Sequence, residues 1–219
     1  MITLYGVSRS RATRPLWALQ ETGMEFKQVP VLQAYRLTGA NAAWSGLTTS
    51  SPEFLAINPL GQVPALADGD VVLTESLAIT LYIARKSGGP LGPATDLETA
   101  QMEQWALFAA TSVEIPALEV YYPLAEGRAD TREGAALIAI GAEKLRRPLK
   151  RLQAWLSTHD YLVGDRFTAA DINTAECIRY AQGHPTLLAE FPAVDAWLHR
   201  CQSRPAFQTM WAARDLESA

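Results

Sequence analysis

The stretch Ser87–Asp96, rich in Gly and Pro, separates two parts of this 219-residue sequence that differ in residue patterning. Before it, short apolar and β-branched runs alternate with segments of helical spacing, which indicates strands and helices in turn. After it, apolar residues recur at helical spacing without strand-like alternation. The 48% of hydrophobic residues is enough for packed cores in both parts. We therefore expect an α/β domain at residues 1–86, a linker at 87–95 and an all-α domain at 96–219.

The first part contains four expected strands and two expected helices. The first strand, first helix and second strand form a β-α-β unit, which implies a parallel pair with a right-handed crossover. The last two strands flank Asp68-Gly69-Asp70 and are expected to form a hairpin. The strands cover residues 2–5, 26–32, 63–66 and 71–73, and the helices cover 14–21 and 75–85.

The second part is expected to be built from helices. Thr168 and Asp171 have the spacing of a capping box at a helix start, and Phe167 and Ile172 could form the accompanying hydrophobic staple. Pro116 lies inside the first helix and is expected to kink it. The four expected helices cover residues 97–121, 131–157, 169–181 and 193–204.

Charge and composition exclude several classes of function. The net charge of −4 argues against binding along a nucleic-acid backbone. No apolar run approaches the roughly 20 residues that span a membrane, and no secretory signal is visible. Cys177 and Cys201 lack C-x-x-C spacing, and the 3 histidines lack metal-ligand spacing. We therefore expect a cytoplasmic protein without a metal, a nucleic-acid partner or a membrane partner.

Two motifs, N-P-L-G-Q-V-P-A-L and T-E-S-L-A-I, carry groups that suit a small peptide. A cis bond between Val63 and Pro64 would leave the amide and carbonyl of Val63 free to pair with an extended ligand. Ser76 and the first N–H groups of the following helix suit a carboxylate, while Glu75 suits an ammonium group. An equally good structural interpretation makes Ser76 a helix cap and Glu75 a solvated side chain.

These motifs resemble the glutathione-binding half of the cytosolic glutathione S-transferases. The opening L-Y-G-V-S-R-S-R-A-T-R and the later F-T-A-A-D-I and W-L-H-R-C-Q-S-R-P-A-F are similar to that family too, and point to serine-type, phi- or theta-like bacterial members. The resemblance implies a thioredoxin-like α/β domain of order β-α-β-α-β-β-α, followed by a helical domain. It also implies glutathione as cosubstrate, a small-molecule electrophile as second substrate, no metal, and a homodimer.

The resemblance further implies the residues that bind glutathione. Val63, before Pro64, would make backbone contacts to the cysteinyl part, and Gln62 would lie beside the glycyl part. Glu75 and Ser76 would hold the γ-glutamyl head.

One feature of the family is replaced in this sequence. Members commonly carry a lysine or histidine that contacts the glycyl carboxylate, whereas Thr48–Ser51 stand here. Thr49 or Ser50 could replace it, as could Arg36 from the irregular stretch 33–51. This stretch is long for a loop, and we expect it to fold over the site.

The implied chemistry needs a thiolate, because a thiol is a poor nucleophile. Lowering the pKa of a free thiol from about 8.5 by about two units takes roughly 2.7 kcal/mol, much of which a hydroxyl at a helix N-terminus can supply. Ser10 is the first candidate, since it stands four residues before Arg14, as in the S-x-A-T-R pattern of serine-type members. Ser8 is the second candidate and Tyr5 the third, and a helix cap remains the alternative role for Ser10. No cysteine occurs in the first 176 residues, so the reactive sulfur is expected to arrive with the ligand.

Three arginines, Arg9, Arg11 and Arg14, crowd the same junction. They could steer an anionic tripeptide or simply be solvated, and Arg14 is expected to be structural because it faces into the first helix.

The second substrate is expected between the domains. The resemblance implies a hydrophobic site from the first long helix and the C-terminal tail, with Phe108, Ser112, Tyr121 and Trp211 as candidates. Trp105, Phe108 and Ser112 form one helical stripe, which core packing explains at least as well.

A glutathione transferase is the leading interpretation: a detoxification enzyme that activates glutathione as a thiolate for conjugation to an electrophile or reduction of a hydroperoxide. A non-catalytic glutathione-binding or regulatory protein on the same fold is the alternative. A glutathione-dependent thiol–disulfide oxidoreductase is disfavoured, because it needs a low-pKa cysteine at the start of the first helix.

Overall fold

The computed structural model describes residues 1–217, which divide into two compact units. Met1–Leu91 and the terminal helix α9 (Pro205–Leu216) form the first unit, and Gly92–Ser203 form the second. The predicted division placed all of residues 96–219 in one helical domain. In the structure α9 packs against α1 and so groups with the first unit.

A four-stranded sheet of order β2-β1-β5-β6 forms the centre of the first unit. β1 pairs with β2 in parallel and with β5 in the antiparallel sense, and β5 and β6 form a hairpin. The predicted β-α-β unit and the predicted hairpin are both present. The strands are β1 (Ile2–Tyr5), β2 (Phe26–Val29), β5 (Ala65–Asp68) and β6 (Val71–Leu73).

The strand predicted over residues 26–32 is wrong in one respect, because Pro30 divides it. Proline has no N–H to donate to a sheet ladder, and the chain changes partner at this residue. The second piece pairs in parallel with a strand from the irregular stretch, in a separate two-stranded sheet. The added elements are β3 (Val31–Leu32), η1 (Ala34–Arg36), η2 (Gly39–Asn41), β4 (Leu47–Thr48) and the single-turn helix α2 (Pro52–Leu55).

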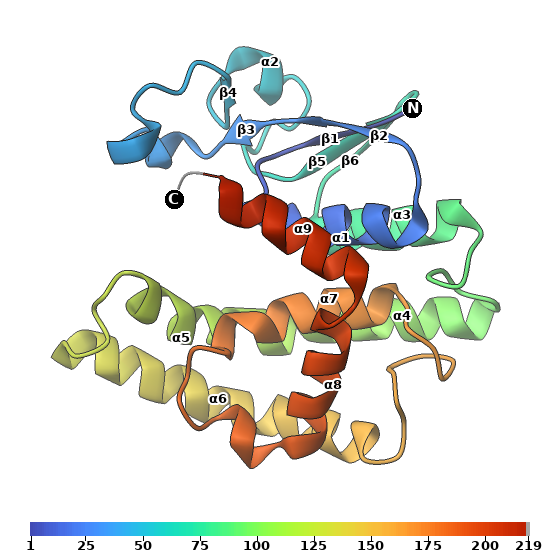
Figure 1. The fold of residues 1–219 in the computed structure, drawn as a ribbon, viewed down its shortest axis with the longest axis vertical. Helices are drawn as coiled ribbons and strands as arrows, with labels where there is room; N and C mark the ends of the chain where they lie inside the picture. The colour runs from blue at the N-terminus through green and yellow to red at the C-terminus, as the bar shows by residue number, and fades with distance from the viewer. Residues whose placement is uncertain (218–219) are drawn as a thin grey trace. The chain divides into compact units, whose positions relative to one another are not determined.

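Two helices, α1 (Thr13–Thr22) and α3 (Ser76–Ser87), cover one face of the four-stranded sheet (Figure 1). Each ends at a glycine in the left-handed conformation, Gly23 with φ 64° and Gly88 with φ 63°, as is common at helix C-termini. α9 lies along α1, where the rings of Trp17 and Phe207 meet edge to face at 4.8 Å.

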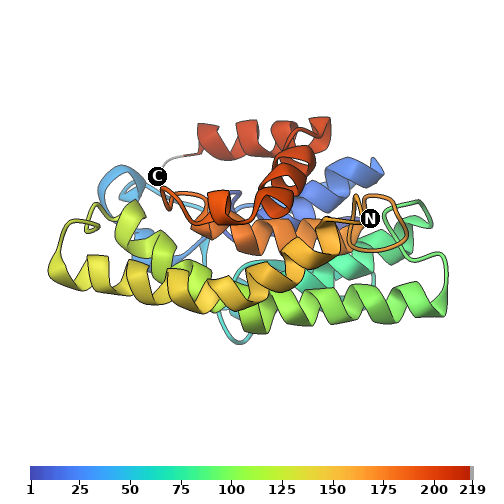
Figure 2. The same ribbon diagram turned by 90° about the horizontal axis from the view of Figure 1, so that it is seen from below.

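The second unit is helical. The helices α5 and α6 run side by side (Figure 2). Within residues 1–217, no helix has the length and apolarity needed to cross a membrane. The helices are α4 (Asp96–Phe108), the π-helical segment η3 (Ala109–Glu114), α5 (Ile115–Ala125), α6 (Arg132–Leu156), α7 (Ala169–Ile178), η4 (Arg179–Ala181), η5 (Leu188–Glu190) and α8 (Pro192–Gln202).

The predicted helix 97–121 is interrupted by this π-helical segment, which directly precedes Pro116. Proline offers no N–H to the carbonyl four residues earlier, and its ring crowds that carbonyl. A π turn absorbs this mismatch within a continuous helix. We expected a kink at Pro116. The structure shows a local change of helix type ahead of the proline.

The predicted capping box at the start of α7 is confirmed. The Thr168 N–H donates to Asp171 Oδ2 at 2.9 Å, and the indole of Trp197 donates to Asp171 Oδ1 at 2.9 Å. Asp171 and Trp197 are fully buried, so this carboxyl group joins α7 to α8 inside the unit. Burial raises the pKa of Asp171 to about 6.

Candidate active site

Three chain segments meet at one end of the four-stranded sheet. β1 ends at Tyr5, which lies opposite Ala65 at the start of β5, and β6 runs antiparallel to β5 and ends at the same side. The loop from β1 to α1, the turn before β5 and the junction from β6 to α3 therefore lie together. A methyl group built on Gly6 would be 3.4 Å from the side chain of Val63, which confirms how closely the first two segments approach.

The bond between Val63 and Pro64 is cis, which meets the condition set out from the sequence. Within residues 1–217, the backbone N–H and carbonyl of Val63 make no hydrogen bond to the chain. The backbone just before β5 thus offers one free donor and one free acceptor, which is what an extended peptide needs for backbone pairing.

Asn58 builds this turn, a role that sequence reasoning missed. It is buried, its amide donates to the carbonyl of Gln62 at 2.7 Å, and its side-chain oxygen accepts from the N–H of Leu60 at 3.2 Å. Gly61 in the same turn adopts φ 59°. A Cβ at this position would lie only 2.7 Å from the carbonyl oxygen of Thr49. The Asn-Pro-x-Gly spacing is the turn signal that could have shown it.

Glu75 joins β6 to α3 in an unusual backbone conformation, with φ 67° and ψ 105°. Such positive φ values are costly for residues other than glycine and are typical of functional sites. Its side chain is exposed, so the conformation aims a carboxylate outward from the sheet end.

Ser76 is the first residue of α3 and does not cap it through its side chain, so the capping interpretation is wrong. Its hydroxyl is buried and accepts a hydrogen bond from Arg14 Nη1 at 2.8 Å. Arg14 is itself only 1% exposed. This pair ties α1 to α3 beneath the site, and the structural role expected for Arg14 is confirmed.

The three candidates for the thiolate donor have different surroundings. Ser10 is half-buried in the β1–α1 loop, where its hydroxyl donates to the carbonyl of Val7 at 2.7 Å and accepts from the N–H of Ala12 at 3.0 Å. Ser8 is buried, with 4% exposure. The Tyr5 ring packs toward Phe54 at 6.3 Å in a small apolar cluster. Ser10 thus holds its hydroxyl in the last turn before α1, whose N-cap is Ala12.

The irregular stretch folds back onto this loop. Arg36 donates to the carbonyl of Arg9 at 3.0 Å. The hydroxyl of Thr49 accepts the N–H of Ala34 at 3.0 Å, whereas Ser50 is exposed. Of the candidates to replace the family's lysine, Thr49 and Arg36 are therefore already engaged with the chain, and Ser50 presents its side chain outward.

The candidates for the hydrophobic substrate site fall in both units. In the second unit, Phe108 is buried beside Trp105 and under the guanidinium of Arg151, which lies 4.7 Å from its ring centre. Ser112 lies in the π-helical segment, and the Tyr121 ring contacts Tyr180 at 5.2 Å. In the first unit, Trp211 on α9 stacks on Phe207 at 5.4 Å.

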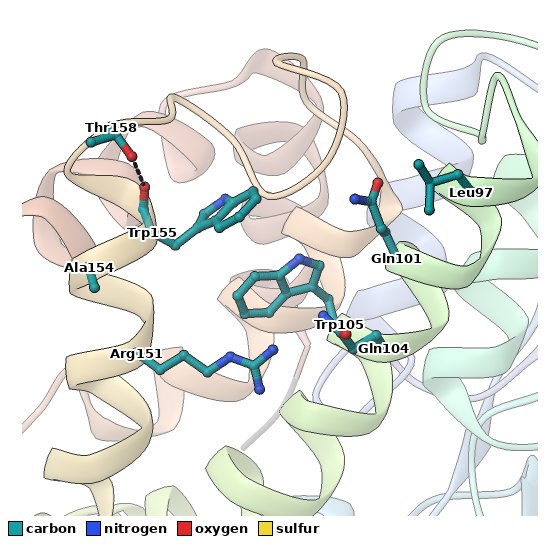
Figure 3. A pocket seen from close by; sticks show the side chains of 8 residues that line it. All are labelled: Leu97, Gln101, Gln104, Trp105, Arg151, Ala154, Trp155 and Thr158. Atoms are coloured by element: carbon teal, nitrogen blue, oxygen red, sulfur yellow. Dashed lines mark hydrogen bonds between the residues drawn. The ribbon is translucent and has the colours of Figure 1, made fainter.

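The second unit also has a pocket of about 560 Å³ between α4 and α6 (Figure 3). Figure 3 shows the indoles of Trp105 and Trp155 and the guanidinium of Arg151 facing it. Phe108, Ser112 and Tyr121 do not line it. The lining residues are Leu97, Gln101, Gln104, Trp105, Arg151, Ala154, Trp155 and Thr158.

Among the 217 residues that the structure describes, no three His, Cys, Asp or Glu side chains are grouped so that they could hold a metal ion. Cys177 and Cys201 are both buried and lie in the second unit.

A thioredoxin-like α/β unit followed by a helical unit defines the class of fold. The chain belongs to the glutathione S-transferase family: residues 4–91 match the family's N-terminal domain and residues 104–205 match its C-terminal domain.

Similar proteins cover nearly the whole chain. Glutathione S-transferase 3 of Zea mays is 37% identical over 97% of this chain and 94% of its own length. The theta class glutathione S-transferase of Xanthomonas axonopodis pv. citri, solved with glutathione bound, is 29% identical with a TM-score of 0.77, over 95% of each chain. A probable elongation factor 1-gamma 2 of Arabidopsis thaliana is 33% identical over 74% of this chain and 40% of its own length.

Proposed function

We propose that this glutathione S-transferase binds glutathione at the end of the sheet where β1, β5 and β6 meet, and that Ser10 stabilises its sulfur as a thiolate. One observation carries the proposal. The unpaired backbone N–H and carbonyl of Val63, the exposed carboxylate of Glu75 and the hydroxyl of Ser10 belong to segments that meet at this end of the sheet. The glutathione-bound relative from Xanthomonas axonopodis pv. citri supports it.

Each part of glutathione has a matching group in this arrangement. The cysteinyl backbone pairs with Val63 before Pro64, as an added strand does. The γ-glutamyl ammonium binds Glu75, and its carboxylate binds Ser76 and the N-terminus of α3. The glycyl end lies toward Gln62 and the exposed Ser50.

The bound thiolate then reacts with a small-molecule electrophile. In conjugation it attacks an electrophilic carbon, a carbon–sulfur bond forms, and the leaving group departs with the electron pair. With a hydroperoxide, it attacks oxygen and the O–O bond breaks to give an alcohol. A second glutathione then forms the disulfide and releases water. We propose that Phe108, Ser112, Tyr121 and Trp211 contribute apolar surface for this substrate.

A non-catalytic glutathione-binding protein on the same fold is the second candidate. The similarity to elongation factor 1-gamma favours this second candidate, because that protein is not named as a transferase. The two candidates share binding and differ in the thiol pKa of bound glutathione and in turnover.

Calorimetric titration with glutathione, followed by an assay with model electrophiles and a hydroperoxide, tests the proposal. Glu75→Gln should weaken binding by about tenfold or more, because the ionic contact to the γ-glutamyl ammonium is removed. Asp70→Asn is the matched control, since Asp70 is an exposed carboxylate at the opposite end of the same hairpin, and it should bind as wild type does. Absence of glutathione binding contradicts the proposal, and binding without turnover favours the second candidate.

We also propose a homodimer in the cytoplasm, as the family resemblance implies. Light scattering at micromolar concentration should give twice the chain mass of 23.9 kDa, and a monomer mass would contradict it.

A further inference from the structure

A carboxylate from the far end of the chain holds the loop that carries Ser10. Glu217 accepts the backbone N–H of Ser8 at 2.7 Å through Oε1 and that of Arg9 at 2.8 Å through Oε2. The side chain of Arg9 donates back through Nε to the carbonyl of Glu217 at 2.7 Å. More than 200 residues of sequence separate the partners, so the contact is a tertiary feature.

The path of α9 delivers Glu217 to this place. At the start of α9, Arg204 makes a bidentate ion pair with Glu21 near the end of α1, at 2.7 and 2.8 Å. Phe207 packs edge to face on Trp17 of α1. The start of α9 is thus held against α1. Glu217, the first residue after α9, binds the loop before α1.

The β1–α1 loop is held from several sides. Inside it, the hydroxyl of Ser10 bridges Val7 and Ala12. From the irregular stretch, Arg36 holds the carbonyl of Arg9. Glu217 adds a third contact, because it accepts the backbone N–H groups of the two residues before Ser10.

We propose that Glu217 is a positioning residue for the transferase reaction, which orders the Ser8–Arg9 backbone and so fixes the place of Ser10 at the glutathione site. The inference rests on the proposed function of Ser10. The Ser10 hydroxyl donates to the Val7 carbonyl in the structure and must rotate to donate to the sulfur. An ordered backbone limits this change to the side chain, and small displacements of such groups cost large factors in rate.

Electrostatics alone would act in the opposite direction. A carboxylate near a thiolate disfavours the thiolate and raises the thiol pKa. If Glu217 acted only through its charge, removing it would lower the thiol pKa of bound glutathione. If it positions the loop, removing it raises that pKa. The sign of the change therefore separates the two roles.

The test compares Glu217→Ala and Glu217→Gln with Asp215→Ala in the full chain. Asp215 is the matched control, because it lies on the same terminal segment with an exposed side chain whose partner is the neighbouring Arg214. Amide hydrogen exchange at Ser8 and Arg9 reports the contact itself. The thiol pKa of bound glutathione, kcat, KM and the melting temperature report its consequence.

With Glu217→Ala we expect exchange at Ser8 and Arg9 to be about tenfold faster or more, as for loop amides released from a partner. We also expect an upward shift of the bound thiol pKa and a kcat about three- to tenfold lower, with KM for glutathione changed less than about twofold. Glu217→Gln replaces one of the two accepting oxygens with an NH₂ donor and should fall between Glu217→Ala and wild type. Asp215→Ala should match wild type.

Unchanged amide exchange in Glu217→Ala would overturn the contact. A lowered thiol pKa or a raised kcat would overturn the positioning role and would instead mean that the tail obstructs the reaction. If the wild type itself shows no lowered thiol pKa, the proposed function of Ser10 fails, while the exchange experiment still decides whether Glu217 orders the loop.

Discussion

At the scale of single residues, the site depends on a few side chains held in costly positions. Glu75 keeps a positive φ that favours glycine, yet its side chain is exposed and makes no cap for α3. A backbone cost without a structural return indicates a functional role. Arg14 and Ser76 are both buried. Their hydrogen bond holds Ser76, the residue that follows Glu75, in place.

Substitution of Glu75 should separate stability from binding. Glu75→Gly relieves the backbone and should raise the free energy of unfolding, by about 1 kcal/mol as for other residues in this region, while glutathione binding is lost. Glu75→Gln keeps the backbone cost and should weaken glutathione binding by about tenfold or more at unchanged stability. Urea denaturation and calorimetric titration measure the two quantities. Glutathione binding by Glu75→Gly as tight as in wild type would contradict the role assigned to this carboxylate.

At the scale of helices and strands, sequence patterning predicted the elements whose signals are local. The β-α-β unit, the hairpin around Gly69 and the capping box at Thr168 all follow from turn and capping chemistry, and all are present. Features that depend on distant contacts were missed. Pro30 could be read as an edge signal, but the partner strand at residues 47–48 lies inside an irregular stretch. α9 was missed although Phe207, Met210 and Trp211 have helical spacing.

The contact between α5 and α6 reverses the usual preference for alanine over glycine. Gly141 is buried in α6, and a Cβ there would lie 2.6 Å from the backbone oxygen of Pro116. Gly141→Ala should therefore lower the free energy of unfolding by about 1–3 kcal/mol, as overpacking does. Ala135→Gly, at an exposed position of the same helix, is the control and should lose about 1 kcal/mol through helix propensity alone. Chemical denaturation of both variants measures this, and a Gly141→Ala variant more stable than wild type would refute the close approach.

The start of α4 should give stability a specific dependence on acid. Arg166 donates to both carboxylate oxygens of Glu98, which also accepts the N–H of Ala94, and these hydrogen bonds lower the pKa of Glu98 to about 2 from an ordinary 4.5. The folded state therefore binds this proton less readily than the unfolded state does. Its contribution is complete above about pH 4.5 and is lost as the pH falls toward 2.

Comparing wild type with Glu98→Gln isolates this contribution. The stability advantage of wild type should shrink as the pH falls from about 5 to about 2, because the glutamine cannot titrate. Taking the difference cancels the opposite effect of Asp171, whose raised pKa is common to both proteins. Thermal or urea unfolding across this range measures it, and a constant difference would show that the ion pair does not hold the pKa down.

At the scale of the whole molecule, the chain is a thioredoxin-like unit and a helical unit that belong to one family, and the proposed chemistry draws on both. The motifs around Pro64 and Glu75 could be placed from the sequence because their backbone geometry is set within short segments. The contact of Glu217 could not be predicted, because its hydrogen-bond partners Ser8 and Arg9 lie more than 200 residues away in the sequence.

The central claim is that Ser10 stabilises the thiolate of bound glutathione. The most direct test is thiolate absorbance of bound glutathione against pH for wild type, Ser10→Ala, Ser8→Ala and Tyr5→Phe. Wild type, Ser8→Ala and Tyr5→Phe should show a thiol pKa about two units below the free value of about 8.5, and Ser10→Ala should return most of the way to it. A wild-type value near 8.5, or a pKa in Ser10→Ala equal to that of wild type, would contradict the claim.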